Sequence, residues 1–169
     1  MKLDKCWLLA AALSTPLLAQ AAEPAQCELV RFADVGWTDI TVTTAVTRHL
    51  LSELGYRTQV KRLSVPDTYK ALQDNRIDVF LGTWMPTSEP HIRPYLDSGA
   101  VETVTANLEG AKYTLAINQA AHEGGVKDFA DLARFSEEFG GKLYGIEPGN
   151  DGNKLIQQMI DKNAFGLAG

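Results

Sequence analysis

The stretch ELVRFADVGWTDITVTTAVTRHLLSELGYRTQVKR, residues 28–62, decides the fold of this 169-residue chain. Residues 28–33 have the apolar pattern of a strand, and a loop containing Gly36 follows them. Residues 39–54 have the period of a helix, and residues 56–62 return to the pattern of a strand. This order predicts two parallel strands that are joined by a crossover helix.

The predicted helix 39–54 has one apolar face, because apolar residues recur in steps of three and four. Thr38 or Asp39 would cap its start, and Gly55 would suit the left-handed residue that follows its end. An apolar face of this kind is typical of a helix that packs on a core. The face comprises Val42, Ala45, Val46, His49, Leu50 and Leu54.

The rest of the chain continues the alternation of strands and helices. We therefore predict an α/β fold with a mostly parallel sheet and helices on its faces. We interpret residues 106–111 as a crossing between two lobes. The further predicted elements are helices at 67–73, near 128–133 and from about residue 150, and strands at 77–83, 101–105, 112–117 and 142–146.

Residues 1–21 have the features of a secretory signal peptide. Two lysines precede an apolar stretch, and Ala19-Gln20-Ala21 matches the small-x-small pattern at a cleavage site. A membrane anchor is the alternative, but the stretch is too short to span a bilayer comfortably. We expect export to the periplasm and no membrane-spanning helix in the mature protein.

Export leaves an odd cysteine. Cys6 would leave with the signal peptide, so that Cys27 would be the single cysteine of the mature chain. In an oxidising compartment it is a free thiol, an intermolecular link, or half of a disulfide whose partner is not in this chain.

Composition and motifs argue against several classes of function. The net charge of −5 does not favour binding to nucleic acid. The sequence has no Gly-x-Ser-x-Gly elbow, no metal-spaced histidine pair and no glycine-rich phosphate loop. The three histidines, His49, His91 and His122, are far apart in the sequence. We therefore expect a binding protein without a metal or cofactor, and not an enzyme.

Three loops are placed to form a ligand site. Ligands bind at the carboxyl ends of the strands in open parallel sheets. Residues 36–39, 82–86 and 147–153 each follow a predicted strand. Tyr113 lies just after the predicted crossing, so it would face the same cleft if two lobes close on each other.

Both tryptophans of the mature chain, Trp37 and Trp84, lie in these loops beside a glycine. Core packing is the alternative role for either residue. Aromatic faces attract cations, and each desolvated face contributes about 0.5–2 kcal/mol. Three or four faces would supply much of the roughly −8 kcal/mol of a micromolar complex. The pattern favours a cage for a quaternary ammonium group.

Polar residues in the same loops have two compatible roles. Asp39 would cap a helix or attract a cation by charge alone, since a methylated ammonium has no N–H to donate. Asn150 and Asp151 would serve as turn and cap residues or bind a ligand hydroxyl. Acceptors favour a hydroxyl, whereas N–H donors at a helix start favour a carboxylate. The residues alone leave open whether the polar end of the ligand is a hydroxyl or a carboxylate.

Three motifs carry a resemblance to a known family. They are FADVGWTD at residues 32–39, DVFLGTWMP at 78–86 and GIEPGNDGN at 145–153. Over residues 25–169 the chain resembles the periplasmic binding proteins of choline and glycine-betaine ABC transporters, with the choline binders nearest. The resemblance implies a two-lobed, type II-like periplasmic-binding-protein fold that closes over its ligand.

The resemblance also implies roles for individual residues. Trp37, Trp84 and Tyr113 would be three walls of an aromatic box. Asp39 would lie against the cation, and Asn150 would bind the choline hydroxyl. Choline would be captured for import through the permease and ATPase subunits of an ABC transporter, by a monomeric binding protein. Glycine betaine is the alternative ligand.

Family members are about twice as long. Residues 22–107 would form the N-terminal part of lobe I, and residues 108–169 an incomplete lobe II. A fourth aromatic residue and the disulfide partner of Cys27 would lie beyond residue 169. We therefore expect a fragment of a longer product or a truncated gene, and a non-functional remnant is a second alternative to choline binding.

Overall fold

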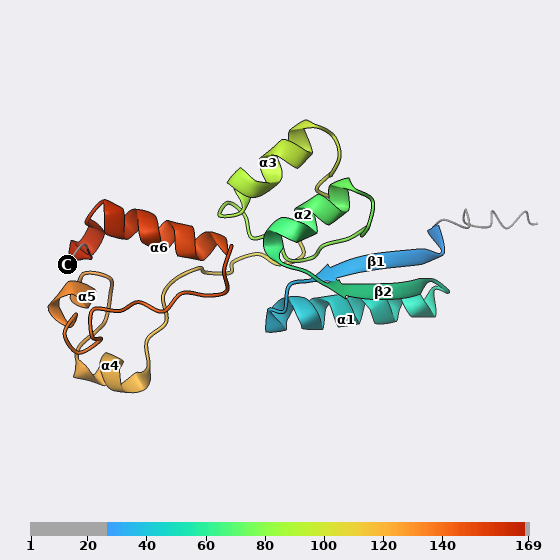
Figure 1. Cartoon of the computed structure of the whole chain (residues 1–169). Coiled ribbons are helices and arrows are strands. Elements are labelled where there is room, and N and C mark those ends of the chain that lie inside the picture. Colours follow the sequence, from blue (N-terminus) through green and yellow to red (C-terminus); the bar gives the residue numbers. More distant parts are fainter. Residues whose placement is uncertain (1–26, 168–169) are drawn as a thin grey trace, which may run out of the picture.

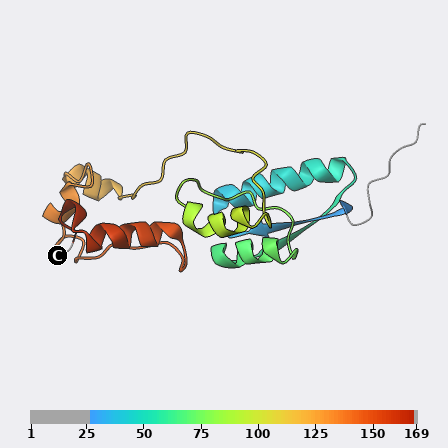
Figure 2. The ribbon, with the colours of Figure 1, turned by 90° about the horizontal axis from the view of Figure 1, so that it is seen from above.

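A computed structural model describes residues 27–167. The predicted signal peptide and Cys6 lie outside these residues. Two groups of elements follow each other along the chain: an N-terminal part that ends with α3 (Glu89–Asp97), and a C-terminal part that comprises α4 (Gln119–Gly124), the irregular segment leading into it and the elements after it (Figure 1). Irregular segments connect the two parts, and the view from above shows the same separation (Figure 2). No helix within residues 27–167 combines the length and the apolar character needed to cross a bilayer.

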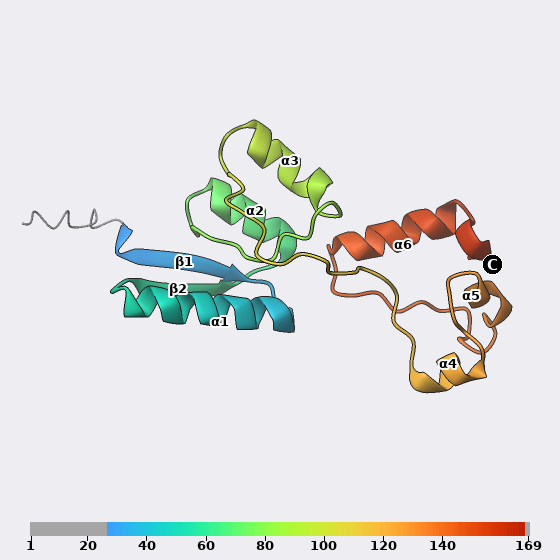
Figure 3. The same ribbon diagram turned by 180° about the vertical axis from the view of Figure 1, so that it is seen from behind.

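The predicted strand–helix–strand unit is confirmed. Strand β1 (Leu29–Asp34) and strand β2 (Arg57–Arg62) are parallel and in register, and α1 (Thr38–Glu53) connects them. Helix α1 covers one face of this sheet, and α2 (Val65–Gln73) with α3 (Glu89–Asp97) lies on the other (Figures 1 and 3). The N-terminal part is therefore a small three-layered α/β unit.

The predicted strand at 77–83 is reduced to a single parallel bridge between Val79 and Phe32. The Ala33 N–H donates to the Val79 carbonyl at 3.0 Å. The Arg31 guanidinium holds the neighbouring Asp78 through nitrogen–oxygen distances of 2.6 and 2.9 Å. The Asp78 and Val79 N–H groups also donate to the Arg31 carbonyl, at 2.7 and 3.1 Å, so the side-chain ion pair adds to a short stretch of backbone pairing with β1.

The predicted strands at 101–105, 112–117 and 142–146 are wrong, because these segments are irregular in the structure. A strand needs a neighbour to satisfy its N–H and C=O groups. None of these segments pairs with a strand among residues 27–167. The Asn107 side chain instead donates to the Leu81 carbonyl at 2.9 Å, which ties the crossing segment to the N-terminal part.

The predicted helices near 67–73, 128–133 and 150 are confirmed as α2, α5 (Asp131–Arg134) and α6 (Asp151–Asp161). The sequence analysis missed α3 and α4 (Gln119–Gly124), as well as the short 3-10 helix Ala164–Gly166. Helix α3 contains Pro94, and helix propensity does not predict a helix there because proline is disfavoured in a helix interior.

The predicted apolar face of α1 is not in the core. Val42, Val46, Leu50 and Leu54 are 55–73% exposed. The side toward the sheet carries Ile40 and Thr44, which are both buried. A sheet with two strands contacts only one narrow side of a helix, so the wider apolar face has no partner among the described residues.

Helix α1 also lacks the predicted cap. Trp37 occupies the N-cap position, and no side chain makes a capping hydrogen bond there. The expectation that Thr38 or Asp39 caps the helix is therefore wrong. Gly55 does adopt the predicted left-handed conformation after the helix end, with φ of 93°.

Two small clusters of buried residues lie on the α2 side of the sheet. Ala33 of β1, Ala71 of α2 and Ile77 form the first cluster. Val65, Tyr69 and Ile92 form the second, and the partly buried Trp37 packs against it. Because Trp37 begins α1, this cluster fixes the loop that follows β1.

Candidate ligand-binding site

A pocket of about 230 Å³ lies where the two parts of the chain meet. Pockets for drug-sized ligands occupy roughly 300–1,000 Å³, so this one suits a smaller molecule. All six residues that the sequence analysis singled out for a ligand lie in its wall. The lining residues are Trp37, Asp39, Trp84, Thr87, Ser88, Tyr113, Ile146, Asn150 and Asp151.

A buried carboxylate at the end of β1 holds the loop that presents Trp37. Asp34 accepts hydrogen bonds from the Gly36 N–H at 2.6 Å and from the Thr41 hydroxyl at 2.8 Å. Gly36 has φ of 90°, and a Cβ there would overlap the Arg62 guanidinium. Trp37 therefore has both roles considered from the sequence, because it packs on the core cluster and also lines the pocket.

Trp84 and Tyr113 form two adjoining walls. Their ring centroids are 5.7 Å apart and their planes are inclined by 40°. Trp84 belongs to the N-terminal part, where its carbonyl accepts from the N–H of the buried Ser88 at 2.7 Å. Tyr113 comes from the C-terminal part, so the aromatic surface combines both parts of the chain.

The third loop fixes the Tyr113 hydroxyl. This hydroxyl donates to Asn150 Oδ1 at 2.9 Å, and the Gly152 N–H donates to the same oxygen at 2.8 Å. Asn150 is the N-cap of α6, so the predicted capping role is confirmed. A Cβ at Gly152 would overlap the Tyr113 hydroxyl, which explains a glycine in the first turn of the helix.

Burial raises the pKa of the Tyr113 phenol, and the charges of Asp151 and Glu147 raise it further. The phenol therefore stays protonated at neutral pH and acts as a hydrogen-bond donor. Its proton lies on the side of Asn150, and its oxygen lone pairs remain acceptors.

Glu147 takes part in this site, although the sequence analysis did not single it out. Its Oε1 accepts from the Trp37 indole N–H at 2.9 Å and from the Asn150 amide at 2.9 Å. Burial pushes the pKa of this carboxyl upward, but these hydrogen bonds outweigh it and leave the pKa below its ordinary value. In the sequence, the only indication of this role of Glu147 was its position in the GIEPGNDGN motif.

Two carboxylates of the lining differ in their surroundings. Asp39 lies in the first turn of α1 and is exposed. The Asp151 side chain is only 10% exposed, and its Oδ1 lies 2.7 Å from His91 Nε2 on α3. Lys154 Nζ lies 2.7 Å from the same imidazole nitrogen. His91 thus connects α3 to α6 beside the pocket.

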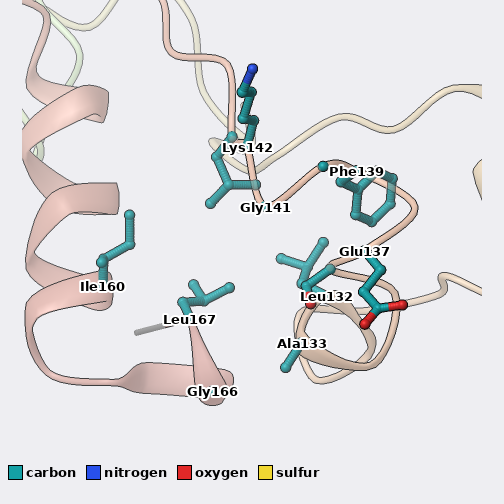
Figure 4. Close-up of a pocket in the computed structure, with 12 residues that line it drawn as sticks. Leu132, Ala133, Glu137, Phe139, Gly141, Lys142, Ile160, Gly166 and Leu167 are labelled. Atoms are coloured by element: carbon teal, nitrogen blue, oxygen red, sulfur yellow. The ribbon is translucent and has the colours of Figure 1, made fainter. Parts of the chain in front are cut away.

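A second hollow, of about 410 Å³, lies between α5 and α6. Leu132, Ile160 and Leu167 contribute apolar side chains to it, and the Lys142 ammonium is directed away from them (Figure 4). Charged groups do not converge on this hollow as they do on the first pocket, so it is the weaker candidate for a polar ligand.

Cys27 is the first residue that the structure describes. Its side chain is exposed, and its thiol is free. Its disulfide pairing therefore stays a prediction. Over residues 27–167, the structure has no cluster of three or more His, Cys, Asp or Glu side chains that would hold a metal ion.

Comparison with known proteins gives consistent matches. Residues 28–168 match the family described as the substrate-binding domain of ABC-type glycine betaine transport systems. A solved ABC-transporter choline-binding protein in complex with choline is 59% identical, with a TM-score of 0.79 over 86% of this chain and 50% of that chain. An unliganded semi-closed form is 58% identical, with a TM-score of 0.75 over 85% and 50% of the two chains.

The uncharacterised protein ORF1 of Chromohalobacter salexigens is 48% identical over 147 residues, which cover 87% of this chain and 95% of that protein. The chain thus spans about half the length of the solved binding proteins and nearly all of ORF1.

This chain belongs to the family of substrate-binding domains of ABC-type glycine betaine transport systems. Its α/β fold matches half of the solved choline-binding proteins, which confirms the fold class inferred from the sequence. Family membership also confirms the interpretation as a substrate-binding protein of a transporter and not an enzyme.

Proposed function

We propose that this chain carries the quaternary-ammonium site of a binding protein for an ABC importer, and that its ligand is choline. The observation that supports this most is the convergence of Trp37, Trp84 and Tyr113, from both parts of the chain, on one small pocket. Indole and phenol faces attract a methylated cation that has no N–H to donate. Asp39 and Asp151 add negative charge to the same wall.

The polar end of the pocket favours a hydroxyl over a carboxylate. Asn150 Oδ1 already accepts from two donors, and the Gly152 N–H is engaged with it. Asp151 and the lone pairs of the Tyr113 oxygen are acceptors beside it. The choline hydroxyl donates to the Asp151 carboxylate, or it replaces the Tyr113 hydroxyl as a hydrogen-bond donor to Asn150 Oδ1. The carboxylate of glycine betaine, the alternative ligand, meets like charge here.

Family membership supports a proposal for the role in the cell. We propose that the mature chain works in the periplasm, as a monomer, and delivers choline to the permease and ATPase subunits of its transporter. The boundary between lobes I and II near residue 107 belongs to the same proposal. The alternative is that this chain, which spans half the length of its solved relatives, does not bind a ligand by itself.

Calorimetry on residues 22–169 tests the ligand, with choline, glycine betaine and 3,3-dimethyl-1-butanol as probes. The last compound has the shape of choline without its charge. We expect choline to bind most tightly and the neutral analogue to bind at least tenfold more weakly. Equal binding of choline and the neutral analogue contradicts a cation site.

A thermal-shift series tests the alternative of a chain that does not bind. A ligand that binds only the folded state stabilises it by about 2.7 kcal/mol at a hundred times its Kd. We expect choline to raise the melting temperature. A cooperative transition that no concentration of choline or glycine betaine displaces favours the non-functional alternative.

A further inference from the structure

Glu147 engages two of the N–H donors that the pocket side chains possess. The lining side chains contain three N–H donor groups, on Trp37, Trp84 and Asn150. The indole of Trp37 and the amide of Asn150 both donate to Glu147 Oε1, at 2.9 Å each. A single carboxylate oxygen outside the lining therefore engages the indole N–H of Trp37 and one N–H of the Asn150 amide.

These two hydrogen bonds to Glu147 affect which ligand the pocket can bind. A carboxylate ligand needs N–H or O–H donors, whereas a hydroxyl ligand needs an acceptor. The Asn150 amide cannot turn its nitrogen toward a ligand without breaking the bond to Glu147, and the Gly152 N–H holds the amide oxygen in place. Buried polar groups that must give up a partner bind a ligand more weakly.

We propose that Glu147 is a specificity-determining residue, which selects choline over glycine betaine by occupying the donors of Trp37 and Asn150. It acts as a positioning residue, because it lies behind the two side chains. The proposal rests on the proposed function, since it assigns the choice between two ligands of that same pocket.

The test compares Glu147→Gln and Glu147→Leu. The glutamine side chain keeps an oxygen at the same reach and loses the charge, whereas leucine removes the acceptor and frees both donors. The affinities for choline and glycine betaine are measured by calorimetry for each variant. We expect the ratio of the two affinities to stay within threefold of the wild-type ratio in Glu147→Gln, and to shift at least tenfold toward glycine betaine in Glu147→Leu.

A second measurement follows the hydrogen bond between the Trp37 indole and Glu147 without any ligand. The Trp37 indole N–H resonance, assigned with Trp84→Phe, should exchange slowly with solvent in the wild type and in Glu147→Gln, and rapidly in Glu147→Leu. Glu138→Gln serves as the matched control, since Glu138 is an exposed glutamate of the C-terminal part. We expect wild-type affinities and exchange from this control.

The outcomes separate the two proposals. If the wild type binds choline but Glu147→Leu weakens both ligands equally, the choline site stands and the specificity role is overturned. A wild-type chain that binds neither ligand overturns the proposed function, and the specificity role with it. Because glutamine is nearly isosteric, a loss of choline preference in Glu147→Gln overturns the role even if the leucine variant does not fold.

Discussion

His91 Nε2 of α3 lies 2.7 Å from Asp151 Oδ1 of α6, although α3 and α6 belong to different parts of the chain. Lys154 contacts the same imidazole nitrogen. The contact connects the two parts beside the pocket, and it keeps the carboxylate of Asp151 next to Trp84 and Tyr113 in the lining.

Removing this connection should weaken ligand binding. We expect His91→Ala to reduce choline affinity by about 1–2 kcal/mol, because the imidazole lies against the largely buried Asp151 carboxylate and keeps it in the pocket wall. Calorimetry measures the change, and His49→Ala is the control, since His49 is exposed on α1. Equal affinities of the two variants would show that the contact does not hold the pocket together.

The aromatic walls should contribute through their faces. Trp84→Ala should weaken choline binding by about 1–3 kcal/mol, and Trp84→Phe by less, because phenylalanine keeps a face of lower negative potential. Titration of choline against the fluorescence of the remaining Trp37 measures both variants. If Trp84→Ala binds as the wild type does, Trp84 is not part of the box.

Gly152 should be required by the nearby phenol. A Cβ at this position would overlap the Tyr113 hydroxyl, so Gly152→Ala must displace the ring from Trp84. We expect at least tenfold weaker choline binding. Gly124→Ala is the matched control, because Gly124 is also helical and has open space around it. That variant should gain up to about 1 kcal/mol of stability with unchanged binding.

The ion pair between Arg31 and Asp78 should make stability depend on pH. The hydrogen bond from Arg31 lowers the pKa of Asp78, against the opposing effect of partial burial. A lowered folded-state pKa contributes stability above the unfolded value of about 3.9, and the contribution disappears as the pH falls through the folded-state pKa.

The Asp78 side chain is 36% exposed, so we expect only about 1 kcal/mol from this pair. Melting temperatures of the wild type and Asp78→Asn between pH 7 and pH 2.5 measure it. The difference between the two proteins should be largest near neutral pH and vanish at the acid end. A constant difference would exclude titration of Asp78 as its source.

The outward face of α1 should tolerate charge. Leu50 is 59% exposed, so Leu50→Glu should change the free energy of unfolding by less than about 0.5 kcal/mol. It should also reduce light scattering at high concentration, because exposed apolar patches favour association. Ile40→Ala is the contrasting variant: Ile40 is 5% exposed, and its truncation should cost about 2–4 kcal/mol. Similar losses in both variants would place the Leu50 face in an interface.

The sequence predicted the elements that local patterns specify. The β1–α1–β2 unit, α2 and α6 follow from local sequence patterns, and the three loop motifs contain five of the six residues predicted for the pocket; Tyr113 was predicted from its place after the crossing segment. The irregular segments at 101–105, 112–117 and 142–146 were predicted as strands because their composition suits one. Strand formation also requires a neighbouring strand, which composition does not specify.

By itself, the sequence determined the family, the parallel order of the first strands and the residue types of an aromatic pocket, since these depend on spacing and on local chemistry. The tertiary structure decided which side of α1 meets the sheet and which groups meet across the pocket. Trp37 and Glu147 are 110 positions apart, and only packing of the two parts brings an indole N–H to a carboxylate. Such contacts depend on how distant segments fill space together, and no local pattern encodes them.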